Sequence, residues 1–383
     1  MDWNLCPREE ARSWLRVALV PGIAPSMLRA LLRAYGSPAA LLAAPHDALE
    51  AAAGAPVARA FREGADARLV EATMRWLECA DHHLLTWGDP RYPALLLEIA
   101  NPPPLLHVAG RIELLAAPAF AIVGSRNAST QGARDAYSFA HALSASGIAI
   151  VSGLAMGIDA AAHRGGLANA GSSIAVMGTG PDVCYPADNA ALAAALARGG
   201  CLVSEFPLGT APRAGNFPRR NRLISGMSKG VLVVEAALGS GSLTTARRAL
   251  EQDRDVFAIP GSIHSPLSKG CHWLIKEGAK LVESADDILR ELGWGSLAPA
   301  PAAKAARAAP EARDAVLATM AFDPVSLEQL AMRTGLAVAE LAARISRFEL
   351  EGRVAALPGG LFQRIDPRAA QARGKASADG VIE

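Results

Sequence analysis

The sequence predicts an α/β protein with a Rossmann-like, doubly wound and mainly parallel sheet at its centre. Three observations indicate this fold class. Short apolar runs without polar alternation recur between residues 119 and 292, as in strands buried on both faces. Helical stretches separate several of these runs, which is typical of parallel strands joined by crossover helices. Before and after this region, apolar residues recur at three- and four-residue spacing, so the sheet is expected between two helical parts.

The bulk composition limits the kinds of protein that this chain can be. Its 383 residues exceed one ordinary domain, and 51% hydrophobic with 20% charged residues indicate a globular protein rather than a disordered one. The balance of 38 basic against 37 acidic residues excludes a protein whose whole surface coats nucleic acid. Any nucleic-acid binding must therefore be confined to a local basic site.

Residues 1–88 are expected to form a small helical domain. Its clearest helical patterns are Ser13–Val20, Ser26–Tyr35 and Ala67–Ala80. The Pro21-Gly22 turn between the first two resembles a helix-hairpin-helix or sterile-alpha-motif-like (SAM-like) module, whose free backbone N–H groups can meet a phosphate. A plain helical packing unit is the alternative, because the turn lacks a second glycine and adjacent lysines.

Residues 89–118 are expected to be a rigid, proline-rich connection, since proline fixes φ and cannot extend a helix or an interior strand. The N-terminus lacks an apolar segment behind basic residues, and no stretch of about 18 apolar residues is free of charges and breakers. Five scattered cysteines without C-x-x-C spacing indicate neither a disulfide framework nor a thiolate zinc site. We therefore expect a cytoplasmic protein that makes no membrane contact.

Residues 119–292 carry the predicted sheet. The candidate strands are Phe120–Val123, Ile148–Val151, Ser173–Met177, Cys201–Ser204, Val231–Glu235, Val256–Ile259 and Lys280–Val282. Ligands of such sheets bind outside the carboxyl ends of the strands. Small and hydroxyl-bearing residues follow these ends, and they are Gly124, Ser125, Arg126, Asn127, Gly153, Gly178, Gly180, Ser242 and Thr244.

These residues predict a phosphate-binding edge, because small side chains let an anion approach backbone N–H groups and helix N-termini. For the glycines alone, tight strand-to-helix turns are the alternative. Arg126 is more informative, since a long cation at this edge needs a partner. No G-x-x-x-x-G-K-[ST] stretch and no strand–G-x-G-x-x-G–helix unit is present, which argues against a P-loop nucleotidase and a dinucleotide dehydrogenase. His163 is helix-borne and more typical of a hydrogen-bonded core histidine than of a base, and His264, Cys271 and His272 lack a metal spacing. No catalytic set is evident.

The segment from Gly215 to Lys229 is the most basic stretch of the chain. The segment contains Arg219, Arg220, Arg222 and Lys229, and Arg213 lies just before it. No residue from 213 to 229 is acidic. Phe217, Asn216 and Asn221 lie among these arginines. Guanidinium groups bind phosphate oxygens and aromatic faces stack bases, so the segment suits a nucleic acid. A solvated helix face with structural ion pairs is the alternative.

The C-terminal part predicts a winged helix after a flexible connection. Residues 293–312 are mostly Ala and Pro and are expected to be a linker, and residues 367–383 a disordered tail. Residues 313–366 carry three helical patterns, Asp314–Met320, Ser326–Thr334 and Val338–Glu351, and a hairpin around Pro358-Gly-Gly360. The third helix is net acidic, which suits duplex phosphates poorly. We expect a protein-contact or regulatory role rather than that of a transcription regulator.

Taken together, the motifs resemble the DNA processing protein A (DprA, also called Smf) family of bacterial single-strand DNA binders. The resemblance runs from about Ala119 to Leu289 in consistent order. Its stretches are Val123–Arg126, Ser152–Asp159 with Ala162-His163, Gly178–Pro186, Asn216–Ser228, Val233–Ala236, Gly241–Ala246 and Phe257–Gly261.

The resemblance implies a Rossmann-like core that binds single-stranded DNA, protects incoming DNA and helps load the RecA recombinase in natural transformation and recombination. It also implies a homodimer through this core, no enzymatic turnover and no cofactor or metal. By motif, the expected DNA contacts are Arg126, Phe217, Arg219, Arg220, Asn221 and Arg222. The arginines would neutralise phosphates, with some of them in structural pairs, and Phe217 would stack a base or pack under the loop.

Two departures from the family pattern concern the expected site. The family often has a basic residue after its Tyr-Pro pair, whereas Ala187 and Asp188 follow Tyr185-Pro186 here. The family commonly has Gly-x-Asn near the end of the core, where this chain has Gly270-Cys271-His272.

An enzyme is the alternative hypothesis: a nucleotide-processing phosphoribohydrolase on a related Rossmann-like fold. That family needs Gly-Gly-x-Gly-Thr-x-x-Glu. The nearest stretch here, Gly239–Ala246, ends in an alanine where the glutamate would be, so the acid is absent.

Overall fold

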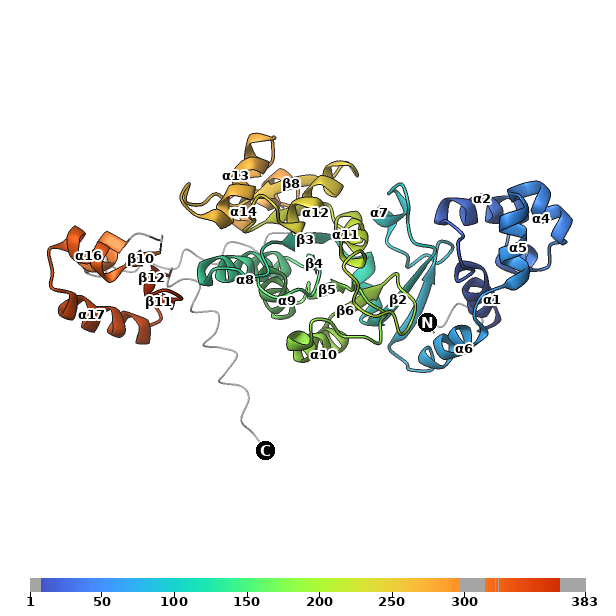
Figure 1. The fold of residues 1–383 in the computed structure, drawn as a ribbon, viewed down its shortest axis with the longest axis horizontal. Helices are drawn as coiled ribbons and strands as arrows, with labels where there is room; N and C mark the ends of the chain where they lie inside the picture. The colour runs from blue at the N-terminus through green and yellow to red at the C-terminus, as the bar shows by residue number, and fades with distance from the viewer. Residues whose placement is uncertain (1–7, 296–313, 321, 323, 366–383) are drawn as a thin grey trace, which may run out of the picture.

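The computed structural model describes residues 8–295, 314–320, 322 and 324–365 (Figure 1). Most of the predicted linker and the predicted tail lie outside the described residues. N-terminal helices, a large central sheet with helices on both faces, and a small winged helix follow one another along the chain. The Rossmann-like fold class, with a helical N-terminal part and a C-terminal winged helix, is confirmed.

The central sheet has nine strands in the order β1-β2-β6-β5-β4-β3-β7-β8-β9. Pairing is parallel from β6 to β9, whereas β1 and β2 are added antiparallel at one edge. The seven strands that the sequence predicted are present as β3 to β9. The bounds are β1 His82–Thr86, β2 Leu105–Gly110, β3 Ala119–Val123, β4 Ala149–Ser152, β5 Ser173–Val176, β6 Cys201–Ser204, β7 Gly230–Val233, β8 Asp255–Ala258 and β9 Lys280–Leu281.

Two layers of helices cover the sheet. Helices α8, α9 and α14 pack on one face around Phe120, Ile122 and Phe257, and α11, α12 and α13 pack on the other around Val123, Val231 and Val233. The short elements around the sheet are α7 Ala94–Leu97, η1 Ile112–Ala116, η2 Ala187–Asn189 and η3 Pro266–Ser268. The helices of the core are α8 Thr130–Ala145, α9 Ile158–Leu167, α10 Ala190–Gly199, α11 Asn216–Gly226, α12 Gly241–Leu250, α13 Lys269–Lys276 and α14 Ala285–Glu291.

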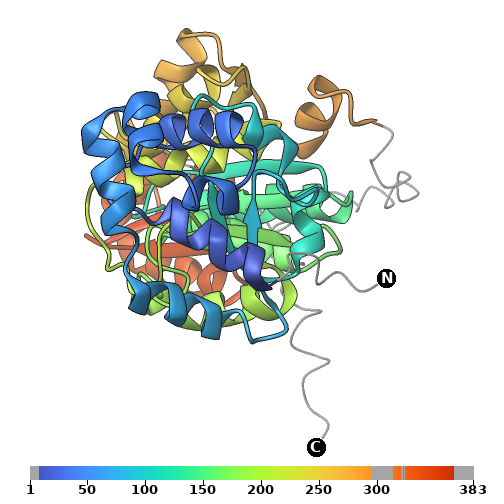
Figure 2. The same cartoon turned by 90° about the vertical axis from the view of Figure 1, so that its right-hand side faces the viewer.

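The N-terminal helices lie at the β1–β2 edge of the sheet, in front of it in the view of Figure 2. Their core is formed by buried residues such as Leu15, Leu28 and Leu31. These helices are α1 Arg8–Ala18, α2 Pro25–Tyr35, α3 Pro38–Leu42, α4 His46–Ala53, α5 Ala55–Glu63 and α6 Ala67–Trp76.

Strands β1 and β2 differ from the expectation for residues 1–118. His82–Thr86 falls in the predicted helical domain and Leu105–Gly110 in the predicted proline-rich connection, but both are strands of the central sheet. Proline does not prevent this, because Pro102 to Pro104 come before the first residue of β2. All six residues of β2 are buried, so this strand belongs to the core.

The winged helix has its own small core around Leu330, Leu341 and Phe348. A capping box begins α16: the N–H of Gln329 donates to Ser326 Oγ at 3.2 Å and the N–H of Ser326 donates to Gln329 Oε1 at 3.1 Å. The elements are α15 Ala315–Met320, β10 Val325–Ser326, α16 Leu327–Thr334, α17 Val338–Leu350, β11 Val354–Leu357 and β12 Leu361–Arg364, with β12 between β10 and β11 in an antiparallel sheet.

Candidate nucleic-acid interface

A cavity of about 770 Å³ opens at the carboxyl ends of the parallel strands. Strand β3 pairs with β4 on one side and with β7 on the other, so the order of the strands reverses at β3. The cavity lies at this point. Ligands of doubly wound sheets bind at such a switch point. The residues that line the cavity come from the loops after β3, β4 and β7, from the loop between β5 and α10, and from α11 and the residues just before it.

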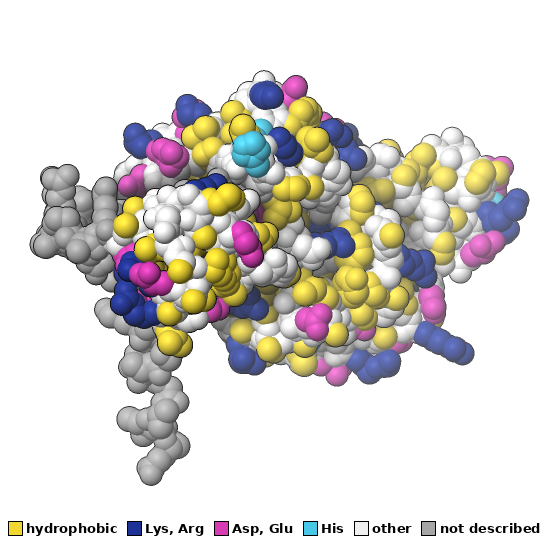
Figure 3. Space-filling model, turned by 60° about the vertical axis from the view of Figure 1, so that its left-hand side comes forward, with side chains coloured by type: hydrophobic (Ala, Val, Ile, Leu, Met, Phe, Trp, Pro, Cys, Tyr) yellow, Lys and Arg dark blue, Asp and Glu magenta, His cyan; other side chains and the backbone are white. Residues whose placement is uncertain are grey.

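Surface charge is mixed on one face of the molecule. On the face drawn in Figure 3, basic and acidic side chains are scattered among apolar ones rather than gathered into one continuous basic surface. This agrees with the balanced composition of the chain and leaves the cavity as the feature that requires explanation.

Close backbone packing holds the loop that carries Arg126. Gly157 has φ +73° at the start of α9, and a Cβ there would lie 2.3 Å from the carbonyl oxygen of Ser125. The N–H of Ile158 donates to that oxygen at 3.1 Å, and the N–H of Ser125 donates to the carbonyl of Glu235 at 2.8 Å. A glycine is therefore required at position 157, and the Arg126 backbone is fixed between the ends of β4 and β7.

The Glu235 carboxylate caps helix α8. Its oxygens accept from the N–H of Ser129 at 2.9 Å and from the Ser129 hydroxyl at 2.6 Å. The Ser129 hydroxyl in turn accepts from the N–H of Gly132 at 2.9 Å. A carboxylate near a helix N-terminus is stabilised by the free N–H groups and the helix dipole. Glu235 thus has a structural function at the end of β7.

Arg126 extends beside the aromatic ring of Phe217. Its Cζ lies 5.6 Å from the ring centroid, within the range of a cation–π contact. Among the residues that the structure describes, no carboxylate forms an ion pair with Arg126. The guanidinium lines the cavity with its charge uncompensated, which is the electrostatic feature that an anion would recognise.

Phe217 is packed on several sides. A Cβ at Gly178 would lie 2.7 Å from its Cδ1, so glycine at 178 makes room for the ring. Asn216 fixes the same contact, because its Nδ2 donates to the carbonyl of Gly178 at 3.1 Å. The ring of Tyr185 lies 5.4 Å away, centroid to centroid, at an interplanar angle of 38°. Phe217 is therefore both a lining residue and a packing residue under the loop.

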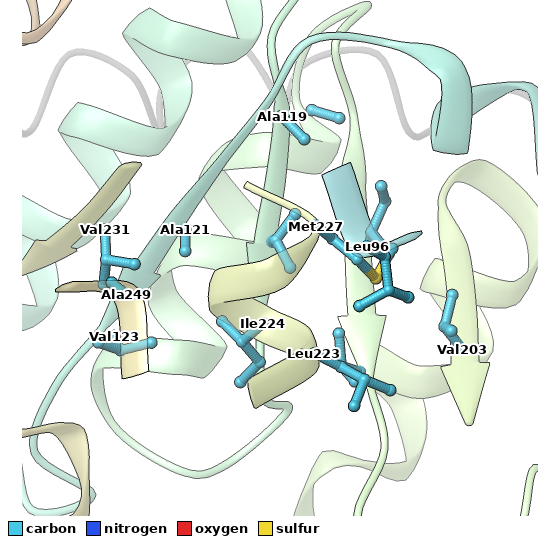
Figure 4. Packing of buried hydrophobic residues seen from close by; sticks show 14 of the residues in the cluster. Leu96, Ala119, Ala121, Val123, Val203, Leu223, Ile224, Met227, Val231 and Ala249 are labelled. Carbon is cyan, nitrogen blue, oxygen red and sulfur yellow. The ribbon is translucent and has the colours of Figure 1, made fainter. Parts of the chain in front are cut away.

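Arg220 is buried, unlike an arginine that contacts phosphate at the surface. It is 4% exposed, and its Nη1 donates to the carbonyl of Gly153 at 2.6 Å and to that of Val176. The face of α11 that carries Leu223 and Ile224 packs on the sheet (Figure 4), and Arg220 lies one turn earlier on this face. Arg220 thus joins the carboxyl ends of β4 and β5 from within.

The Asp159 carboxylate and the Arg220 guanidinium both lie beside Gly153, where their opposite charges attract. Asp159 accepts from the N–H of Gly153 at 3.1 Å and of Ala155 at 3.4 Å. Burial lowers the pKa of Arg220 to about 10 and raises the pKa of Asp159, because each charged form loses water. The attraction between the two charges opposes both shifts. Gly153 is enclosed between the two side chains, which leaves no room for a larger residue.

Arg219 and Arg222 share one carboxylate. The Glu205 side chain is 2% exposed, and its Oε2 accepts from Arg219 Nη2 at 3.2 Å and from Arg222 Nη2. Arg222 also donates to the carbonyl of Asn101 at 2.5 Å, and burial lowers its pKa while the Glu205 charge opposes this. Arg219 is 57% exposed. Arg222 therefore braces the structure, whereas Arg219 remains open to solvent.

The start of α12 also lines the cavity. Ser240 caps this helix by accepting from the N–H of Ser242 at 3.3 Å, and the two hydroxyls lie 2.7 Å apart. Asn221 joins α11 to this helix, because its Nδ2 donates to the carbonyl of Gly241 at 3.4 Å. Hydroxyl and amide groups that can meet an anion thus line the same cavity as Arg126.

The structure brings together nine of the fifteen residues predicted for the site. Those that line the cavity are Gly124, Ser125, Arg126, Asn127, Phe217, Arg220, Asn221, Ser242 and Thr244. The other six lie behind or beside it, and they are Gly153, Gly178, Gly180, Asn216, Arg219 and Arg222. Lining residues that sequence reasoning missed include Asp159, Tyr185, Ser240 and Thr245. Each of them lies in a quoted motif or directly beside one, so the motifs themselves were the available signal.

His163 is a core histidine. Its Nε2 accepts from the N–H of Leu154 at 3.2 Å, and its Nδ1 lies 2.7 Å from the Ser173 hydroxyl. Burial lowers its pKa to about 3, so the ring is neutral at physiological pH. Within the described ranges, no group of three or more His, Cys, Asp or Glu residues is placed to hold a metal ion.

Two family models match the chain, and together they cover the sheet and the winged helix. Residues 83–293 match the model of DNA recombination-mediator protein A, and residues 299–360 match that of the DprA winged helix domain. The chain belongs to the DprA family. The family match begins within β1, which agrees with the place of that strand in the sheet. Members of this family are named for DNA processing.

Individual relatives support the same assignment. The chain is 45% identical over 298 residues to Protein Smf of Escherichia coli K12, an alignment that covers 76% of this chain and 80% of that protein. The X-ray structure of DNA processing protein A from Streptococcus pneumoniae superposes with a TM-score of 0.64 at 38% identity, covering 74% of this chain and 98% of that one.

A second solved structure is DNA processing protein A from Helicobacter pylori, which was described for its single-stranded DNA binding mode. It superposes with a TM-score of 0.50 at 28% identity and covers 55% of this chain and 95% of that one. No helix in the part of the chain that the structure describes is long and apolar enough to cross a membrane.

Proposed function

We propose that this protein binds single-stranded DNA at the cavity on the carboxyl edge of the sheet. The observation that carries the proposal is Arg126, a cation without a carboxylate partner among the described residues, in a cavity lined by hydroxyl, amide and backbone groups. Phosphate oxygens match such donors. The Helicobacter pylori relative that binds single-stranded DNA supports the same ligand.

The arginines have different functions in this proposal. Arg126 and the exposed Arg219 bind phosphates, and Asn127, Ser242 and Thr244 add polar contacts. Arg220 and Arg222 hold the strand ends and the loop at Asn101 in place, since their guanidinium groups already bond to backbone carbonyls. Phe217 supports the loop at Gly178 from below.

A single strand fits this cavity better than a duplex. The site is a pocket enclosed by loops rather than a long basic face, and aromatic rings line it. Bases of a single strand can turn into such a pocket, whereas bases of a duplex are stacked and paired inside the helix.

Membership in the family extends the proposal to the biological role. We propose that the protein protects incoming single-stranded DNA and helps load the RecA recombinase, and that it acts in the cytoplasm as a homodimer through the Rossmann-like core, without enzymatic turnover. The winged helix then serves protein contacts or regulation. The proposed units are residues 1–88, 119–292 and 313–366, with connections at 89–118 and 293–312 and a tail at 367–383. Strands β1 and β2, which lie in 1–88 and 89–118, are added to the sheet of 119–292.

Fluorescence anisotropy with labelled single- and double-stranded oligonucleotides, titrated at several salt concentrations, tests the ligand and the site. We expect preference for the single strand. Changing Arg126 to Ala should weaken binding by roughly 10-fold or more and reduce the salt slope by about 0.7, the value for one phosphate contact on a single strand. Arg248→Ala is the matched control, because Arg248 is exposed and paired with Glu251 at 2.6 Å. Equal binding of the duplex, or an unchanged slope for Arg126→Ala, would overturn the proposal.

The phosphoribohydrolase alternative has less support. Ala246 is buried in α12 where that family needs a glutamate, and Asp159 is the one carboxylate among the described residues that line the cavity. Asp159 is engaged by Arg220 and two backbone N–H groups, so it cannot serve as a free acid. Release of a free base from a nucleoside monophosphate by the purified protein, measured by chromatography, would reverse this ranking.

A further inference from the structure

The two aromatic rings of the cavity differ in how much of each is free. Phe217 is in contact with Gly178, with the Arg126 guanidinium and with Tyr185. Tyr185 is 43% exposed, one of the larger apolar side chains left in solvent in the described part of the chain. It lines the cavity beside Phe217, so its exposed ring is part of the proposed site. An aromatic ring that is half exposed in a cavity with an unpaired cation suits a base better than core packing does.

The backbone around Tyr185 is held by bonds on both sides. Before it, the Thr179 hydroxyl donates to the carbonyl of Val183 at 2.6 Å, and the Asp182 carboxylate accepts from the N–H of Gly209 at 2.9 Å. After it, Asn189 Nδ2 donates to the carbonyl of Leu154 at 2.9 Å. The loop therefore presents the ring with little freedom left to lose on binding.

We propose that Tyr185 stacks a DNA base while Arg126 binds a neighbouring phosphate. The proposal rests on the function proposed above and adds the residue that recognises the base. Arg126, Phe217 and Tyr185 form one continuous row, with Phe217 in contact with both of the others. Each nucleotide of a single strand carries a base beside a backbone phosphate, so a cation and an exposed ring on either side of Phe217 match both parts of the strand. Every base has a π face, so the contact tolerates any sequence.

The test compares Tyr185→Ala, Tyr185→Trp and wild type by anisotropy with a normal single strand and with one that carries abasic sites. We expect Tyr185→Ala to bind the normal strand roughly 10-fold more weakly, and Tyr185→Trp to retain affinity because its ring also stacks. The salt slope of Tyr185→Ala should equal that of wild type, since no charge is removed. Removing bases should weaken wild type much more than Tyr185→Ala. Tyr137→Ala is the matched control, because Tyr137 lies on α8 outside the cavity lining.

A spectroscopic readout separates stacking from a structural effect. A 2-aminopurine strand should lose fluorescence on binding to wild type and to Tyr185→Trp, and keep most of it with Tyr185→Ala at saturation. If Tyr185→Ala binds within twofold of wild type, or if it weakens normal and abasic strands equally, the assignment of Tyr185 is wrong while the proposed function stands. If wild type does not bind single strands at all, it is the proposed function that fails.

Discussion

The cavity edge of the sheet and helix α17 of the winged helix both carry arginines, but the neighbours of these arginines differ. Arg126 has an aromatic ring beside it and no ion-pair partner within the described residues. In α17, Arg344 pairs with Glu340 at 2.6 Å, and Arg347 pairs with Glu351 at 3.4 Å. Both also lie 3.8 Å from Asp314. Whether arginines are paired with carboxylates, rather than how many cations are present, therefore decides whether a surface can attract phosphates.

The same distinction applies within α11. Three of its residues are arginines, yet one is buried against backbone carbonyls, one is braced by Glu205 and the loop at Asn101, and one is exposed. A count of positive charge along the sequence treats them alike. Buried, exposed and paired arginines should therefore respond differently to substitution.

The largest effect is expected from Arg220→Met. It leaves Asp159 buried without its counter-ion, which should lower the free energy of unfolding by roughly 3–5 kcal/mol. Urea denaturation followed by circular dichroism measures this. Arg219→Met is the control: Arg219 is 57% exposed, so a change within about 0.5 kcal/mol is expected. A mild effect at Arg220 would mean that it behaves as a surface arginine, and the division within α11 would be lost.

The next effect concerns pH and the buried histidines of the core. Burial lowers the pKa of His107 to about 4 and that of His163 to about 3. In the unfolded chain both titrate near 6.5, so between pH 4 and 6.5 the unfolded state binds more protons. The free energy of unfolding should therefore rise by roughly 2 kcal/mol for each histidine, or about 4 kcal/mol for both, from pH 4.5 to 6.5 and then level off. The raised pKa of Asp159 acts in the opposite direction and reduces the total.

Tryptophan fluorescence during denaturation measures this rise for the sheet and the helical part alone, because all six tryptophans precede residue 295. No histidine follows His272, so the winged helix should not contribute. In His107→Leu, the free energy of unfolding should rise less steeply with pH, because the unfolded chain can bind one proton fewer. An unchanged slope in that variant would show that the rise has another source.

A smaller effect is expected from Arg219→Ala. Removing an exposed cation beside the cavity should weaken single-strand binding by roughly 3- to 5-fold and lower the salt slope by about 0.7 at most. Anisotropy measures both quantities. Arg290→Ala on α14 is the control, since Arg290 is 74% exposed and pairs with Asp287. If Arg219→Ala matches that control, Arg126 is the one arginine of the pair that contacts DNA.

The smallest effect is expected from the double variant Arg344→Ala, Arg347→Ala. Because these cations are already paired, single-strand affinity should stay within about twofold of wild type. The same anisotropy titration, repeated with duplex DNA, completes the comparison. A loss of 10-fold or more with either DNA would show that ion pairs in α17 do not prevent phosphate binding, and the contrast with the cavity would fail.

The parallel part of the fold could be predicted from sequence because buried strands appear as continuous apolar runs. Strands β3 to β7 have this pattern and were found, and so were β8, which begins at the exposed Asp255, and the short, exposed edge strand β9. Strands β1 and β2 were missed, although Leu105–Gly110 is an apolar run. Their place depends on antiparallel pairing of β2 with β6, about a hundred residues later, and no local pattern specifies that partner.

For the site, the sequence indicated the right edge of the sheet but not the function of each arginine. The burial of Arg220 had a readable signal, since it lies three and four positions before the core residues Leu223 and Ile224 on the same helix face. The partners of Arg220 had no readable signal in the sequence. Its guanidinium meets the carbonyls of Gly153 and Val176 only because three separate segments pack together. Tyr185 lies in the Gly178–Pro186 motif, but that its ring is exposed in the cavity beside Phe217 depends on the fold of the loop and has no local signal.

The β1–β2 hairpin belongs to two hydrophobic cores at once. Leu84 and Leu105 pack among the N-terminal helices, whereas Leu85 and Leu106 pack in the core of the sheet. Strain applied to one part is transmitted to the other through paired strands instead of being absorbed by a hinge. The helices and the sheet should thus lose structure in one cooperative step, and a chain shortened to begin after β1 would expose an apolar strip along β2 where other molecules could aggregate.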